Sequence, residues 1–293
     1  MSGEPKRARY PDEQGYVERD GVRVFWERYG DGEPSVLFLP AWPLTPARVW
    51  KAQIPYLARH ARVLAFDPRG NGRSDRPADP ESQSPAQYAG DALAVMDAGR
   101  AARAVVVGVG PGTQAALLLA TEQAERVDGL VLITPDPWPA DRYVESVGRG
   151  ELDRYDDWDR FNPFYWRRDW PGFAHWWARK VCALPHSTRQ IEDVTQWIAA
   201  AEPEAVIANT FAMATMDREG VLALAEQVRC PVIVIYDDER QIAPGDTWTP
   251  LADATGGQLL KIDGANFIGQ SRKPVAFNLA LREFVTSKEE THA

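Results

Sequence analysis

The sequence predicts an α/β protein with a mostly parallel central sheet, helices on both faces of that sheet and an inserted helical lid. Short apolar runs, typical of strands buried on both faces, alternate with helical segments over residues 15–134 and again over residues 217–287. Between these parts, residues 135–216 lose the alternation and contain most of the 11 tryptophans. A length of 293 residues accommodates one core domain with such an insertion.

The first part of the chain alternates strands with helices in a regular order. Residues 21–30 alternate apolar and polar side chains, which predicts a strand that ends at the turn Gly30-Asp31-Gly32. Continuous apolar runs predict buried strands at 35–40, 62–67, 103–110 and 127–134. Apolar residues at helical spacing predict the intervening helices at 46–60, 85–99 and 111–123.

The same alternation returns near the C-terminus. It predicts strands at 231–236 and 258–263, and helices at 245–254 and 273–285. The polar segments 1–14 and 288–293 are expected to be tails. The insertion, residues 135–216, is expected to be a helical, aromatic-rich lid, because large side chains hold a small helical layer together. A lid over the carboxyl edge of the sheet would enclose a pocket there.

Composition argues against several classes of function. The formal net charge of −9 and the lack of a Lys/Arg-rich run argue against nucleic-acid binding. No apolar run is long enough to span a membrane, and the polar N-terminus lacks the apolar core of a secretory signal, so a cytoplasmic protein is expected. Cys182 and Cys230 are too few for a disulfide framework and belong to no metal-binding spacing. We therefore expect no metal, no cofactor and no membrane partner, and a homodimer stays open.

Five motifs follow one another along almost the whole chain. They are FLPAWPLTPARVW from Phe38, FDPRGNGRSDRP from Phe66, GVGPGT from Gly108, PVIVIYDDERQIAP from Pro231 and IDGANFIGQSRKPVAFN from Ile262. This set resembles the lidded members of the α/β-hydrolase superfamily. The second motif is the most specific, because it matches the turn after the fourth strand of that family almost residue for residue. The resemblance implies the α/β-hydrolase fold.

The same resemblance places unusual residues where the family keeps its catalytic triad. The family's elbow G-x-S-x-G reads GVGPG here, so Gly110 occupies the position of the nucleophile. Arg240 falls at the position of the acid, and Phe267 falls at the position of the histidine. The resemblance therefore implies a degenerate triad, in which serine, acid and histidine have all been replaced.

The oxyanion hole differs from the family pattern as well. One family donor is the backbone N–H of the residue after the nucleophile, and that residue is Pro111, which has no N–H. The other donor follows a His-Gly pair that reads Pro40-Ala41 here, although the N–H of Trp42 can still donate. A phosphate loop is not indicated, because the third glycine of a dinucleotide fingerprint would fall at Thr113.

These changes predict a pocket with a new task. Arg240 would supply a fixed positive charge for a carboxylate, phenolate or enolate, and Asp136 follows a strand whose loop carries the acid in some family members. These two are the catalytic candidates. The expected ligand-binding residues are Trp42, Gly110, Pro111, Trp138, His175, Asn266 and Phe267. Such walls favour a large, planar, apolar ligand, either aromatic or polycyclic, and His175 is also a candidate substitute base.

The function predicted from these residues is non-hydrolytic. We expect a natural-product tailoring enzyme that cyclises, adds, eliminates or forms C–C bonds by positioning and charge stabilisation, without an acyl-enzyme. Two alternatives stay open. One is a receptor or carrier that binds a ligand without catalysis, and the other is a hydrolase whose catalytic groups are displaced.

Overall fold

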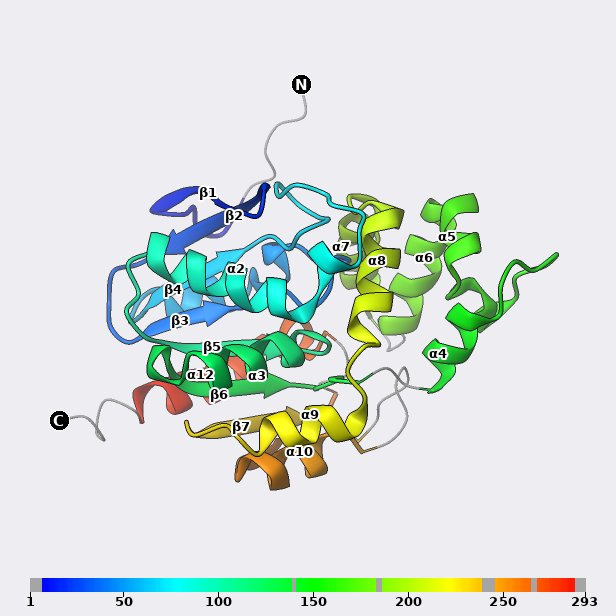
Figure 1. Cartoon of the computed structure of the whole chain (residues 1–293). Coiled ribbons are helices and arrows are strands. Elements are labelled where there is room, and N and C mark those ends of the chain that lie inside the picture. The colour runs from blue at the N-terminus through cyan, green and yellow to red at the C-terminus, as the bar shows by residue number, and fades with distance from the viewer. Residues whose placement is uncertain (1–6, 139–140, 183–185, 239–245, 265–267, 288–293) are drawn as a thin grey trace.

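An eight-stranded sheet in the order β1-β2-β4-β3-β5-β6-β7-β8 forms the centre of the molecule (Figure 1). The computed structural model describes residues 7–138, 141–182, 186–238, 246–264 and 268–287, and the elements below belong to this part of the chain. The strands are β1 (Glu13–Arg19), β2 (Val22–Tyr29), β3 (Ser35–Phe38), β4 (Arg62–Phe66), β5 (Ala104–Val109), β6 (Val127–Ile133), β7 (Val232–Tyr236) and β8 (Gln258–Lys261).

The sheet is mostly parallel, as the alternation of apolar runs and helices predicts. Strands β4, β3, β5, β6, β7 and β8 pair in parallel, whereas β1 and β2 pair antiparallel to each other and β2 pairs antiparallel to β4. Every residue of β5 is buried, because helices cover both faces of the central strands. The predicted fold class, a mostly parallel sheet flanked by helices, is confirmed.

One face of the sheet carries α2 (Pro85–Ala98), α3 (Gly112–Glu122), α9 (Arg218–Ala225) and α10 (Trp248–Thr255). The other face carries α1 (Ile54–Leu57), α11 (Gly269–Arg272) and α12 (Pro274–Thr286). The single helix predicted at 46–60 is wrong: it is a 3₁₀ turn at Ala47–Trp50 followed by α1. Pro55 explains the break, because proline fits only the first turn of a helix.

Strand β1 and helices α9 and α11 were not predicted. Strand β1 begins inside the segment expected to be a tail, and its side chains alternate between half-buried and exposed. Its polar composition is typical of an edge strand, which gives little hydrophobic signal. Helix α9 precedes β7, in a stretch of the core for which no element was predicted. Among the described residues, none of the helices combines the length and apolar character that crossing a membrane requires.

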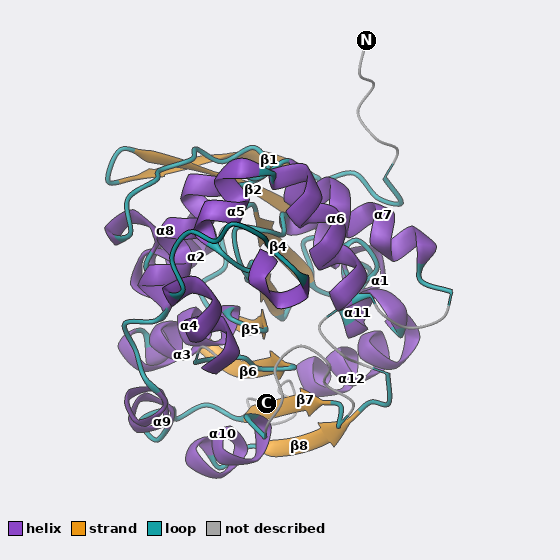
Figure 2. Cartoon of the chain, turned by 90° about the vertical axis from the view of Figure 1, so that its right-hand side faces the viewer, coloured by secondary structure: helices purple, strands orange, loops and turns teal. Residues whose placement is uncertain are grey.

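Five helices lie beyond one end of the sheet, between β6 and β7 in the chain (Figures 1 and 2). They are α4 (Asp141–Gly148), α5 (Pro163–Arg168), α6 (Trp170–Val181), α7 (Thr188–Ala199) and α8 (Pro203–Met213). We call this group the helical layer. A cluster of buried rings packs within it: the centroid of Phe173 lies 5.0 Å from that of Trp166 and 6.2 Å from that of Trp177. Aromatic packing therefore stabilises the layer.

The turn after β4 connects the sheet to the helical layer. The side-chain amide of Asn71 donates to the carbonyl oxygens of Pro43, at 2.7 Å, and of Trp197 in α7, at 3.1 Å. A Cβ on Gly70 would lie 2.7 Å from the Cβ of Ala205 in α8, and Gly70 has a φ of +94°. Glycine is required at this position because α8 approaches the turn closely and the backbone is left-handed.

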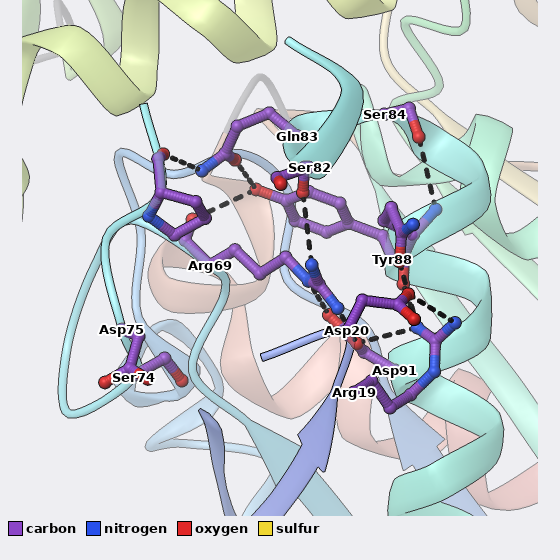
Figure 3. A network of polar contacts seen from close by, with 12 residues as sticks. Arg19, Asp20, Arg69, Ser74, Asp75, Ser82, Gln83, Ser84, Tyr88 and Asp91 are labelled. Carbon is purple, nitrogen blue, oxygen red and sulfur yellow. Dashed lines mark hydrogen bonds and ion pairs between the residues drawn. The ribbon is translucent and has the colours of Figure 1, made fainter. Parts of the chain in front are cut away.

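A buried ion pair stabilises this turn. The Arg69 guanidinium donates to both carboxylate oxygens of Asp91 in α2, at 2.6 and 2.7 Å, and the two side chains are 0% and 1% exposed. Figure 3 shows Arg19 approaching the same carboxylate and Tyr88 lying between Arg69 and Gln83. The ion pair therefore fixes the turn that contacts the helical layer.

Candidate functional site

The corner between β5 and α3 holds Gly110 in a sharp turn. Gly110 has a φ of +53°, a left-handed conformation that favours glycine, and Pro111 follows with a φ of −60°. The N–H of Gly110 donates to the carbonyl of Ile133 at 3.0 Å. Its own carbonyl accepts the N–H groups of Thr113 and Asp136, each at 3.2 Å. We call this corner the elbow; it has the sharp turn of a nucleophile elbow but no side chain at its centre.

Asp136 lies directly beside the elbow. It follows β6, its backbone N–H donates to the Gly110 carbonyl, and its side chain is buried, with the residue 7% exposed. Asp136, which the sequence predicts as catalytic, and Gly110, at the predicted nucleophile position, therefore lie side by side at the carboxyl edge of the sheet. Open α/β sheets bind their ligands at this edge.

Two buried hydroxyl groups flank the elbow. The Oγ1 atoms of Thr113, in α3, and Thr134, at the end of β6, have no hydrogen-bond partner in the part of the chain that the structure describes. Thr134 also has a φ of +39°, which is strained for a β-branched residue and is a feature of functional sites. Sequence reasoning missed Thr134, because an apolar run ending in threonine gives no sign of its backbone conformation.

The loop after β3 packs onto the elbow from the other side. A Cβ on Gly112 would lie 2.7 Å from the carbonyl oxygen of Pro40. Two residues on, Trp42 is buried, and its ring centroid lies 5.8 Å from that of Phe161 and 6.1 Å from that of Trp177. The backbone N–H of Trp42 donates no hydrogen bond to any described residue. This N–H is therefore available to a substrate oxygen.

The other predicted ligand-binding residues are placed differently. Trp138 is half-buried in the cluster on the α2 and α3 face, and the Arg218 guanidinium lies 5.6 Å from its ring centroid. His175 is exposed on α6, because it lies on the opposite side of that helix from the buried Phe173 and Trp177. The structure does not bring these two side chains to the elbow. Arg240, Asn266 and Phe267 lie outside the described residues.

Among the described residues, we considered the Cys182 thiol as an alternative nucleophile and His, Cys, Asp and Glu groups as a metal site. Burial raises the pKa of the Cys182 thiol to about 12, so this group stays protonated at neutral pH and is a poor nucleophile. No group of three or more His, Cys, Asp or Glu residues among those described could hold a metal ion.

Asp67, in the turn after β4, has a carboxyl group whose pKa is well above its usual value. Burial raises its pKa to about 6, and the nearby Glu27 adds to the rise. The backbone N–H groups of Arg73 and Ala47 lower the pKa in turn, because they donate hydrogen bonds to the carboxylate at 2.9 and 2.8 Å. A Cβ on Gly72 would lie 2.2 Å from Oδ2 of Asp67, so glycine is needed at that position.

We expect the stability of the protein to decrease as Asp67 ionises. An unfolded aspartate titrates near pH 3.9, so between about pH 4 and pH 6 the folded state binds more protons than the unfolded state. The free energy of unfolding contributed by this group should therefore fall by about 3 kcal/mol across that window. Asp67→Asn should lack the decrease, as measured by urea unfolding from pH 4 to pH 7. The exposed Asp253→Asn serves as the control, and a wild-type curve parallel to that of Asp67→Asn would contradict the prediction.

Comparison with known proteins identifies relatives of this chain. A family model described as alpha/beta hydrolase fold matches residues 34–272. A non-heme chloroperoxidase from Streptomyces lividans is 35% identical over 122 residues, which are 40% of this chain and 43% of that protein. An epoxide hydrolase from Caballeronia sordidicola is 27% identical over 193 residues, which are 64% of this chain and 53% of that protein. The matches span about half the length of these two relatives.

A solved structure extends the likeness to nearly the whole chain. The enol-lactonase from Burkholderia xenovorans superposes with a TM-score of 0.76 and 21% identity, and covers 93% of this chain and 100% of that one. At this identity the match establishes the fold alone.

These findings overturn the expectation of a non-hydrolytic tailoring enzyme. One of the two relatives is named as a hydrolase, the epoxide hydrolase, and neither relative is named for cyclisation, elimination or C–C bond formation. The expectation equated the predicted loss of the triad, at Gly110, Arg240 and Phe267, with the loss of hydrolysis. Hydrolysis requires an activated water and a stabilised oxyanion, and residues other than the triad can provide both.

Proposed function

This chain belongs to the α/β-hydrolase family, and on that premise we propose that it is a hydrolase that attacks its substrate with water instead of a serine at the elbow. This is the alternative in which the catalytic groups are displaced. The observation that carries it is the hydrogen bond from the Asp136 N–H to the Gly110 carbonyl, which places a carboxylate-bearing residue beside the vacant nucleophile position.

The proposed reaction needs one base and one oxyanion donor. The Asp136 carboxylate accepts a proton from a water molecule while the water oxygen attacks the carbonyl carbon of an ester or lactone. The resulting oxyanion accepts a hydrogen bond from the backbone N–H of Trp42. Asp136 then returns the proton to the leaving alkoxide as the C–O bond breaks. The products are a carboxylic acid and an alcohol.

The surroundings of Trp42 indicate the substrate class. Its ring packs against those of Phe161 and Trp177, so the wall next to the oxyanion donor is aromatic. Aromatic walls favour apolar and planar groups through dispersion and stacking. We therefore assign to this site an ester or lactone that carries an apolar, preferably aromatic, group.

Hydrolysis by direct attack of water makes a distinctive kinetic prediction. With aryl esters, we expect steady turnover without a burst, because no covalent intermediate accumulates. In ¹⁸O-labelled water under single-turnover conditions, the product acid should carry one labelled oxygen, and intact-mass spectrometry should show no acylated protein. Absence of turnover on all aryl esters and lactones tested would contradict the hydrolase function. A stoichiometric burst with acylated protein would contradict the direct attack of water.

A further inference from the structure

A cavity of about 400 Å³ lies between the turn after β4 and helix α7. Gly110, Pro111, Trp42 and Asp136 do not line it, so it is distinct from the site at the elbow. Its volume is within the range of small-molecule sites in proteins. An adjoining cavity of about 310 Å³ shares Arg7, Glu27 and Arg48 with it.

The lining of the 400 Å³ cavity contains more guanidinium groups than carboxylates. The cations are Arg7, Arg48, Arg73 and Arg189, and the acids are Glu27, Asp67 and Asp193. Because water is partly excluded from such a cavity, the pairing of these groups determines what charge a ligand would meet.

Each of the three carboxylates has donors already. Glu27 forms an ion pair with Arg7, and Asp193 forms ion pairs with Lys51 and Arg189. Asp67 accepts the two backbone N–H groups described above. The cavity therefore offers no carboxylate that lacks a donor.

Two of the four arginines have no carboxylate partner among the described residues. The side chain of Arg48, on the 3₁₀ turn Ala47–Trp50, forms no hydrogen bond or ion pair with any of them. Arg73 donates to the neutral amide oxygen of Gln14 at 3.3 Å, and its guanidinium lies 3.9 Å from the ring centroid of Phe25. Stacking on Phe25 holds the Arg73 guanidinium in place without neutralising it.

We propose that this cavity binds a short dicarboxylate, with one carboxylate on Arg48 and the other on Arg73. Guanidinium groups bind carboxylates through charge-assisted and often bidentate hydrogen bonds. Arg48 lies on a turn whose first N–H is held by Asp67, and the backbone N–H of Arg73 donates to the same carboxylate. One buried side chain thus fixes the backbone at both ends of the proposed site.

Binding can be measured by calorimetry at constant ionic strength, with succinate, glutarate and adipate as probes. The tightest of the three should bind about tenfold or more tightly than its monoamide, which has the same length but only one carboxylate. Arg48→Met and Arg73→Met should each reduce its affinity by a similar factor. Arg59→Met is the matched control, because Arg59 is exposed and lines neither cavity.

Three results would overturn the proposal: equal affinity for the diacid and its monoamide, unchanged affinity in Arg48→Met, or an equal loss in the control. Thermal unfolding of each variant shows whether it is folded. Because the Arg48 side chain forms no hydrogen bond or ion pair with a described residue, its replacement should leave the melting temperature almost unchanged. Binding of the dicarboxylate should also persist in an Asp136→Asn variant, so the outcome is independent of whether the chain is a hydrolase.

Discussion

Asp136→Asn should lower kcat/KM for ester hydrolysis by about 10²- to 10⁴-fold, the range that general-base catalysis contributes. The amide has nearly the shape of the carboxylate but cannot accept the proton of the attacking water. Because substrate contacts such as the Trp42 N–H are unchanged, the loss should appear in kcat and leave KM nearly constant. Steady-state kinetics over the full substrate range separates the two parameters.

The matched control is Asp128→Asn, near the amino end of β6, the strand that Asp136 follows; Asp128 forms an ion pair with Arg103. It should retain wild-type kinetics. Asp136→Glu should recover part of the activity, since it restores a base at a shifted position. If Asp136→Asn keeps wild-type kcat and an unchanged melting temperature, Asp136 is not the base and the proposed mechanism fails.

The parts of the fold that sequence predicts best are those with a strong hydrophobic period. The apolar runs of β5 and β6 predict strands buried on both faces, and the structure shows them at the centre of a parallel sheet. Elements with weak or mixed signals were missed or predicted in the wrong form. Polar β1 and the proline-interrupted helix at 46–60 are examples, because edge exposure and Pro55 override the local pattern.

The site was predictable where a motif fixes backbone geometry. The glycine elbow and the position of Asp136 follow from strand ends that meet at one edge of the sheet. The exposure of His175 and the φ of Thr134 depend on how the helical layer packs and how the chain leaves β6, which no short motif encodes. Nor does the predicted change of the triad determine the reaction, since the chemistry depends on all the groups around Gly110.

Asp91→Asn should lower the free energy of unfolding by about 3–5 kcal/mol, the usual cost of leaving one member of a buried ion pair without its partner. The Arg69 guanidinium would stay in a site from which water is excluded, facing a neutral amide in place of two carboxylate oxygens. Urea unfolding at pH 7 measures the change. Asp97→Asn, on the same helix, is the control. It breaks the ion pair between Asp97 and Arg126, in which the Asp97 side chain is 63% exposed, so it should lower the free energy of unfolding by less than about 1 kcal/mol.

A double variant tests whether the cost arises from the uncompensated charge. Arg69→Met with Asp91→Leu removes both fully buried charges and keeps apolar volume in the same place, so it should be more stable than Asp91→Asn alone; the partly exposed Arg19 loses the Asp91 carboxylate in both variants. If the double variant is less stable than Asp91→Asn, the ion pair contributes net stability to the fold. In that case hydrogen bonds such as that from Arg69 to the Ser82 carbonyl contribute more to the free energy of unfolding than the uncompensated charge costs. Both outcomes bear on the helical layer, because the turn that carries Arg69 also contacts α7 and α8.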